Sequence, residues 1–166
     1  METKKVFKWY WVWDFEKEEQ WLNEMAAQGW ALSRVGWCTY HFERTEPGEY
    51  EVRLECRKAD DGYLSFVQET GAEYLGRVFM WIYFRRKSEK GRFELNGDLD
   101  SRIAQLNTIN RFILPIGLLN LGIGLINVSR TGLGAVNLLC AVVLAYAYGR
   151  IQGKKEELLR ERRLHE

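Results

Sequence analysis

The chain is 166 residues long with a formal net charge of +1, but residues 1–100 contain 19 acidic and only 15 basic residues. This acidic balance argues against a nucleic-acid-binding head. The cysteines Cys38, Cys56 and Cys140 form no CxxC pair, and the histidines His41 and His165 lie far apart. These spacings argue against a disulfide framework and a zinc site, and we expect no bound cofactor.

Residues 1–95 are predicted to form one cytosolic domain that begins with a strand and a helix. Residues 4–13 are dense in aromatic and β-branched side chains, which favours a strand. Asp14 is placed to cap a helix over residues 15–28, in which apolar side chains recur at helical spacing, and Gly29 is placed to end it.

Two further strands follow the first helix. Residues 30–44 are predicted to form one strand, residues 46–49 a turn, and residues 50–58 another strand. In the latter, apolar side chains alternate with charged ones, which predicts one buried and one solvated face.

The domain is predicted to close with a short helix and a fourth strand. Asp60 and Asp61 are placed to cap the helix, Gly71 to end it, and residues 74–86 to form the strand. The resulting order βαββαβ predicts a ferredoxin-like α+β sandwich. A helix-free β-barrel is the weaker alternative, because the first helix has a clear 3.6-residue period.

One face of the predicted sheet is a candidate partner-binding surface, since exposed aromatic patches usually mark an interaction site. It combines aromatic residues and arginines of the fourth strand with one tyrosine of the first: Tyr10, Arg77, Phe79, Trp81, Tyr83 and Arg85. A protein partner, a second copy of the chain or its own membrane helix are the favoured occupants. RNA fits less well, because the third strand presents acids outward. Residues 88–100 covering this face are a further alternative.

The chain contains no motif for nucleotide binding, metal binding or nucleophilic catalysis, so we expect a protein that is not an enzyme. Glu16, Glu18 and Glu19 cluster in the first turn of the predicted helix, where acids on a solvated face complement the helix dipole. His41 is interpreted as structural. An enzyme of unrecognised type that uses His41 is the remaining alternative.

Residues 112–148 predict a transmembrane helical hairpin. Its two apolar blocks, residues 112–128 and 133–148, each cover roughly 25 Å as helices, close to the thickness of a hydrocarbon core. A buried helical hairpin of a soluble domain is the alternative. Residues 96–111 are predicted to form an amphipathic connecting helix before the blocks, and residues 149–166 a charged cytoplasmic helical tail after them.

Basic residues lie outside the apolar blocks and predict the orientation of the hairpin. Arg102 and Arg111 precede the first block, and Arg130 alone lies in the turn. Six basic residues follow the second block: Arg150, Lys154, Lys155, Arg160, Arg162 and Arg163. Since cations mark the cytoplasmic side, we expect a two-pass protein of the cell membrane with both termini cytoplasmic and no cleaved signal peptide.

Small and amide side chains inside the apolar blocks are predicted to pack the two helices together. Folding the hairpin about its turn places a small residue of one helix against an amide of the other. The residues concerned are Asn120, Gly124, Asn137, Ala141, Ala145 and Gly149. A conduction path through the membrane is the alternative. A transporter would normally have a charged residue within its spans, but the only one between residues 112 and 148 is Arg130, in the turn.

Three stretches resemble the domain-of-unknown-function family twenty-eight-twelve, whose members are small bacterial proteins, mostly Gram-positive, often with membrane spans. They begin at Lys4 (KKVFKWYWVWDFEKEEQWLNEMAAQGWAL), Tyr40 (YHFERTEPGEYEVRLE) and Glu69 (ETGAEYLGRVFMWIYFRR). One departure is that Gly71 is followed by Ala72, where the family commonly has Trp. The resemblance implies no established activity. It also implies a gene neighbour of the PadR repressor type, and therefore regulation at the membrane.

These patterns predict a membrane-anchored cytosolic sensor, adaptor or accessory subunit that acts through protein contacts or as a homo-oligomer. A PadR-type transcriptional regulator is the partner that the resemblance implies. The alternative is a small oligomeric transporter or permeability factor, for which the asparagines of the apolar blocks would matter more than the surface of the head.

Overall fold

The computed structural model describes residues 2–57, 60–91, 93, 95, 99–129 and 132–165. The chain divides into two compact units, Met1–Leu95 and Asn96–Glu166, which we call the head and the helix pair. Each unit is described by itself below.

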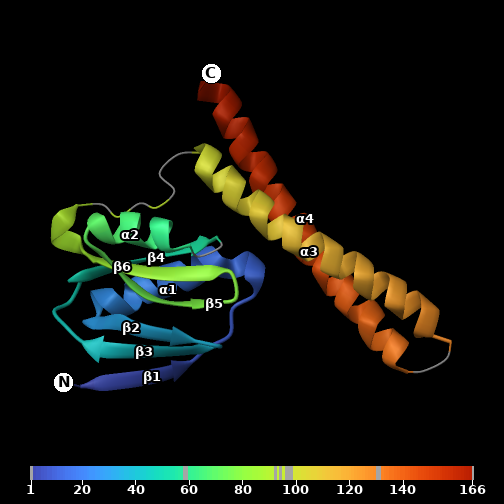
Figure 1. Cartoon of the computed structure of the whole chain (residues 1–166), viewed down its shortest axis with the longest axis horizontal. Helices are drawn as coiled ribbons and strands as arrows, with labels where there is room; N and C mark the ends of the chain where they lie inside the picture. The colour runs from blue at the N-terminus through green and yellow to red at the C-terminus, as the bar shows by residue number, and fades with distance from the viewer. Residues whose placement is uncertain are drawn as a thin grey trace. The chain divides into compact units, whose positions relative to one another are not determined.

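The head contains two three-stranded antiparallel sheets (Figure 1). The first sheet has the order β1-β3-β2, and the second sheet has the order β4-β6-β5. The first half of the head comprises β1 (Thr3–Phe7), the 3-10 helix η1 (Val12–Asp14), α1 (Phe15–Ala27), β2 (Trp30–Gly36) and β3 (Thr39–Arg44). The second half comprises β4 (Tyr50–Cys56), α2 (Asp61–Glu69), β5 (Ala72–Val78), β6 (Trp81–Lys87) and the 3-10 helix η2 (Ser88–Lys90).

The α+β class is confirmed, but the single four-stranded ferredoxin-like sheet is not. The segments 30–44 and 74–86, each predicted as one strand, are β-hairpins. Their turns contain Cys38 and Phe79, whose backbone φ angles of 51° and 54° lie in the left-handed region. The first strand is also shorter than predicted, because β1 ends at Phe7. Lys58, predicted to end the third strand, lies outside the described residues.

The two halves of the head repeat one βαββ unit. In each half the first strand pairs with the third, and the second strand also pairs with the third. Trp30 pairs with Arg44 in the first half, as Ala72 pairs with Arg86 in the second. Each second strand has a register shift at the same place, between Leu32 and Arg34 or between residues 74 and 76. The head is therefore an internal repeat.

The helix ends of the head mostly follow the sequence. Gly29 and Gly71 have φ angles of 81° and 82°, the left-handed conformation that ends a helix at low cost for glycine. Asp60 caps α2 by accepting a 2.9 Å hydrogen bond from the backbone N–H of Tyr63. Asp14 precedes α1 but makes no side-chain cap hydrogen bond, because its carboxylate pairs with Lys17 at 2.7 Å instead.

The core of the head lies where α1 meets both sheets. Leu22 and Met25 of α1 belong to one buried cluster with residues of the first sheet and of the second: Leu32, Val35, Tyr40, Phe42, Val52, Leu54 and Tyr83. The other face of the second sheet is covered by α2, through a cluster of Val67, Ala72, Ile82, Phe84 and Phe93. Strand β6 is therefore buried on both faces. Its continuous apolar run Trp81–Phe84 is typical of such a strand.

The helix pair consists of α3 (Leu99–Asn127) and α4 (Leu133–His165), which run antiparallel (Figure 1). The segment of the predicted connecting helix is the first part of α3 rather than a separate element, and its first predicted residues, 96–98, lie outside the described residues. Ile103, Leu106 and Ile109 of this segment are buried and form an apolar stripe. Across the pair, Asn110 donates a 3.2 Å hydrogen bond to Gln152.

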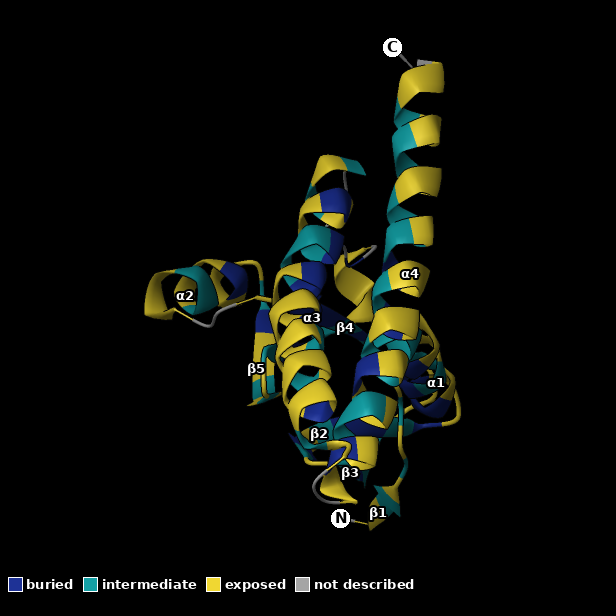
Figure 2. Cartoon of the chain, turned by 90° about the vertical axis from the view of Figure 1, so that its right-hand side faces the viewer, coloured by how far each residue is buried: buried dark blue, intermediate teal, exposed yellow. Residues whose placement is uncertain are grey.

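Beyond that stripe, exposed residues, drawn yellow in Figure 2, run along both helices, and many of them are apolar. Exposed examples on α3 and α4 are Phe112, Leu118, Leu119, Leu125, Ile126, Leu133, Val136, Leu139 and Val142. Both helices are long and apolar enough to cross a membrane, and only 22% of the apolar window of each is buried. A soluble helical hairpin would bury its apolar residues, so this exposure favours a lipid environment.

The membrane residues predicted to pack the pair divide into two groups. Gly124 lies against Leu138, where an added Cβ would come within 3.0 Å of the Leu138 backbone N, and Ala141 is buried. Ala145 and Gly149 are exposed. Asn120 and Asn137 are half-buried, and each donates a hydrogen bond to a carbonyl of its own helix one turn earlier. The turn residues Arg130 and Thr131 lie outside the described residues.

We predict that Gly29→Ala lowers the thermal stability of the head more than Gly48→Ala does. Both glycines have positive φ, but a Cβ at Gly29 would also meet the carbonyl oxygen of Thr45 at 2.8 Å, whereas Gly48 has open space. We expect a loss of about 1 kcal/mol or more for Gly29→Ala. Tryptophan fluorescence of the full chain in detergent measures this, because all seven tryptophans lie in the head. Equal losses would contradict the close approach.

Candidate functional site

The six residues predicted to form one exposed sheet face do not share a surface. Phe79 and Arg77 are exposed, Phe79 at 70%. Tyr83 is buried, with 4% of its surface exposed, and Tyr10 and Trp81 pack half-buried against the main core. Arg85 is half-buried and is held by carboxylates. The physical reason is that α1 and α2 cover the two faces of the second sheet, which leaves no open aromatic face.

Arg85 bridges the two sheets. Its guanidinium forms ion pairs with Glu43 of the first sheet at 2.5 Å and with Glu73 of the second at 2.8 Å. It also donates to the backbone carbonyl of Leu32 at 3.0 Å. The two acids hold the pKa of Arg85 above its usual range, against the effect of burial. Arg85 is thus a structural tie rather than a free contact residue.

Glu18 of α1 is a buried acid that contacts both sheets. Its Oε1 accepts a 2.8 Å hydrogen bond from the hydroxyl of Tyr40, in the first sheet, and a 2.6 Å hydrogen bond from the hydroxyl of Tyr83, in the second. Glu18 is 8% exposed. The sequence analysis predicted that this acid lies on a solvated face. That prediction is wrong, because the side of α1 that carries Glu18 packs against both sheets.

Burial sets the protonation chemistry of this cluster. Removal from water raises the pKa of Glu18, and the two tyrosine hydrogen bonds only partly oppose that rise. Burial and the Glu18 charge together raise the pKa of Tyr40 and of Tyr83, so both stay protonated donors. The pKa of nearby Tyr10 is raised to about 12 by the same two causes, together with the charge of Glu24.

The neighbouring side chains of α1 satisfy the outer edge of the second sheet. Glu19 Oε2 accepts from the backbone N–H of Leu54 at 2.8 Å. Asn23 accepts from the N–H of Val52 at 2.8 Å and donates to its carbonyl at 3.0 Å, much as a paired strand would. Helix α1 therefore covers a strand edge that would otherwise be open to pairing.

This constellation does not resemble a catalytic site. Glu18, Glu19 and Asn23 direct their polar atoms at tyrosine hydroxyls and backbone groups. Among the described residues no group of three or more His, Cys, Asp or Glu could hold a metal ion. His41 is half-buried on β3, and its carbonyl accepts a 3.1 Å hydrogen bond from Ser33. The arrangement ties the two sheets together, and the functional chemistry has to be sought on the surface.

An acidic groove runs along the exposed side of α1 beside β4. It has a volume of about 560 Å³ and is open to solvent. Its lining residues are Glu16, Glu19, Gln20, Asn23, Glu24, Ala27, Gly48, Tyr50, Glu51, Arg53 and Ser88. Arg53 is the only cation among them, and it pairs with both Glu19 and Glu51. The groove therefore carries a net negative charge.

A second hollow of about 500 Å³ adjoins the groove through the shared residue Tyr50. It lies at the end of the head where β3 turns into β4, and its residues include Glu43, Glu46 and Glu49. A turn around Pro47 forms this end, closed by a 3.1 Å hydrogen bond from the N–H of Glu49 to the carbonyl of Glu46. Arg44 also lines this hollow, and Glu43 and Glu49 pair with Arg85 and Lys87. We call this end, with Glu46 and the adjoining part of the groove, the acidic end of the head; the groove itself extends along α1 to Glu16.

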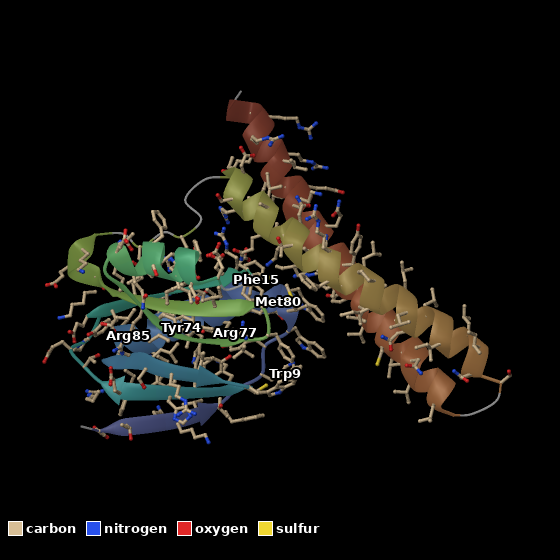
Figure 3. The ribbon with its side chains drawn as sticks, viewed as in Figure 1. Trp9, Phe15, Tyr74, Arg77, Met80 and Arg85 are labelled. Carbon is tan, nitrogen blue, oxygen red and sulfur yellow. The ribbon has the colours of Figure 1, made fainter. Side chains whose placement is uncertain are left out.

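The opposite end carries exposed aromatic residues. We call Phe7, Trp9, Trp11, Trp37 and Phe79 the aromatic tip; their exposure ranges from 47% to 74%. Figure 3 shows Trp9 and Met80 gathered at this end and Arg85 toward the other. Phe79 is the one residue of the tip that sequence analysis assigned to a partner-binding surface.

The other four residues of the tip were missed for a local reason. Sequence analysis placed Trp9 and Trp11 inside the first strand, but β1 ends at Phe7 and the chain continues irregularly to η1. Gly36 before Trp37 is a turn signal that could have divided the segment 30–44. The turn at Phe79 contains neither Gly, Asn nor Pro, so no sequence signal marks it.

We predict that Glu18→Gln flattens the pH dependence of the head's stability. Because a carboxyl with a raised pKa binds its proton more tightly in the folded state, its contribution is fully present below the unfolded pKa of about 4.3 and is lost as pH rises through the folded pKa. The wild-type melting temperature should therefore rise as pH falls from 8 to 5.

Glu18→Gln keeps an oxygen for the two tyrosines but removes this charge, so its slope should be shallower. Glu19 and Glu55, whose pKa values are also raised by burial, leave a residual slope. The control Glu69→Gln, an exposed acid of α2, should keep the wild-type slope. Tryptophan fluorescence gives the melting temperature of each protein as a function of pH. Identical slopes of melting temperature against pH for all three proteins would show that Glu18 is not a buried acid.

A family model described as "Protein of unknown function (DUF2812)" matches residues 14–118. The match begins just before α1, covers the rest of the head and extends into α3. No curated protein and no solved structure matches the chain.

Proposed function

This chain belongs to the DUF2812 family, and we propose that it is a membrane-anchored cytosolic adaptor or accessory subunit without catalytic activity, which acts through protein contacts. The observation that carries the proposal is the polar division of the head, with an acidic, hollowed end and an acid-free aromatic tip. A head of this kind offers binding surfaces rather than an enclosed active-site pocket.

The helix pair supports the anchoring role. Its exposed apolar side chains need an apolar surrounding, and its basic residues lie outside the apolar blocks. Lys and Arg are in excess before the apolar part of α3 and after the apolar part of α4. This excess favours a cytoplasmic position for the head and for both termini. The cell membrane is therefore the proposed location.

The acidic groove is the proposed protein-binding surface, and a basic segment is its proposed partner chemistry. Glu16 and Glu24 lie exposed on α1, and Arg53 is already neutralised by Glu19 and Glu51. Complementary charge speeds encounter and selects the partner more than it adds affinity. DNA-binding proteins carry basic surfaces, so a PadR-type transcriptional regulator fits this chemistry. The head would then hold such a regulator at the membrane and respond to a signal there.

The transporter alternative finds less support. Asn120 and Asn137 each donate one hydrogen bond to a carbonyl of their own helix, which suits amides in an apolar surrounding. Two helices without an ionisable group at depth would need several copies to form a polar path.

We predict that Glu24→Lys removes a specific partner when the chain is purified from native membranes in mild detergent. The substitution reverses charge in the groove at an exposed position of α1, so the head should stay folded. Glu69→Lys makes the same charge change on α2, outside the groove, and should keep the partner. Mass spectrometry of the co-eluting proteins decides between them. Identical partner profiles for the wild type and both variants would contradict a role for the groove.

We also predict that reporter fusions give opposite compartments for the C-terminus and the turn between α3 and α4. A reporter after Glu166 should be cytoplasmic, and one inserted into a lengthened turn at residues 129–132 should be external. An external C-terminus would overturn the orientation and place the acidic groove away from any cytosolic regulator.

A further inference from the structure

The aromatic tip is assembled from segments that are far apart in the sequence. β1 ends at Phe7, opposite Thr39 of β3, and the next backbone N–H, of Lys8, donates to the carbonyl of Cys38 at 3.0 Å. This hydrogen bond fixes the start of the segment with Trp9 and Trp11 beside the turn with Trp37. The tip is therefore a surface built by the fold of both halves.

Aromatic rings pair within the tip while staying open to solvent. Trp37 and Phe79, from the turns of the two β-hairpins, meet with ring centroids 4.6 Å apart in a T-shaped arrangement. Trp9 and Trp11 meet in the same way at 5.6 Å. Although they touch each other, Trp37 and Phe79 remain 61% and 70% exposed. Such a group of large exposed rings marks an interaction surface.

Backbone strain supports a role for this surface. Phe79 has a φ of 54°, a conformation that is unfavourable for a bulky residue and that Gly or Asn would adopt more easily. The stability of the head alone would favour such a substitution. A strained, exposed phenylalanine is therefore better explained by what its ring contacts outside the head.

The charge around the tip identifies the occupant. The three segments that form it, residues 7–13, 36–39 and 77–81, contain no acid and two cations. Arg77 is exposed, and Lys8 is half-buried with its ammonium over the rings of Tyr10 and Trp21. Elsewhere in residues 1–100 acids outnumber cations. Tryptophan rings combined with Lys and Arg are the residues that settle at the boundary between lipid headgroups and acyl chains, and the cations are attracted by anionic lipids.

We propose that the aromatic tip docks on the anionic cytoplasmic surface of the bilayer that holds the helix pair, an inference that rests on the proposed membrane anchor. The head and the apolar part of α3 belong to one chain, with α3 beginning four residues after Leu95. Tethering makes the bilayer the surface that the tip meets at the highest effective concentration. Docking in this orientation leaves the acidic end free for a cytosolic protein.

The test uses the full chain in lipid nanodiscs and its seven tryptophans, all in the head, as the probe. Discs contain brominated phosphatidylglycerol or brominated phosphatidylcholine, since bromine quenches tryptophans that reach the lipid. We expect quenching in the anionic discs, weaker quenching in the neutral ones, and a loss in high salt, because about 1 M salt shortens the screening length to about 3 Å.

Two variants and a control make the test specific. Phe79→Asn suits the left-handed backbone, leaves all tryptophans in place and should lose most of the quenching. Arg77→Glu, which also keeps every ring, should reduce quenching in the anionic discs. Phe66→Gln removes an equally exposed phenylalanine from α2, outside the tip, and should quench like the wild type.

The outcomes separate this inference from the proposed function. A chain that enters the discs but shows no quenching, or shows the same quenching in Phe79→Asn, overturns the docking and leaves the anchor intact. Tryptophan contacts between two heads in place of lipid quenching, detected by crosslinking, assign the tip to a second copy and also overturn it. A chain that does not enter the discs overturns both the anchor and the docking.

Discussion

The carboxylate of Glu18 is the interaction on which the architecture of the head depends. One oxygen accepts from Tyr40 of the first sheet and from Tyr83 of the second, and it is carried by the helix that packs on both. Loss of this acceptor would leave two buried hydroxyls unpaired, at a cost of about 1–3 kcal/mol each. Arg85 reinforces the join from the strand side, so the two βαββ halves act as one body.

This join decides where function can reside. Helix α1 packs between the two sheets, and α2 covers the remaining face of the second sheet. The apolar side chains of β6 are therefore part of the two core clusters and are not available to a partner. The exposed features considered for recognition are the acidic groove along α1, which adjoins the hollow at Tyr50, and the aromatic tip. Under the proposed docking, the aromatic tip would face lipid and the acidic groove would stay open to a cytosolic partner.

Local features of the head could be predicted from the sequence, and its topology could not. Gly29, Gly71 and the Asp60 cap follow from backbone chemistry that few other residues supply. The apolar blocks of the helix pair were equally readable because their pattern is long. The hairpin of the second half was not, since its turn at Phe79 is formed by residues with no turn preference, whereas Gly36 could have indicated the hairpin of the first half. The place of Glu18 depends on tyrosines 22 and 65 residues away, which no local pattern reveals.

A double-mutant cycle of Tyr40→Phe and Tyr83→Phe in the full chain tests most directly whether Glu18 joins the two sheets. Both hydroxyls donate to one oxygen, so the effect of losing one should depend on the presence of the other. The account predicts a coupling of about 0.5 kcal/mol or more in the unfolding free energy followed by tryptophan fluorescence. Strictly additive effects of the two substitutions would show that the tyrosines act independently and would contradict the shared carboxylate as the link between the halves.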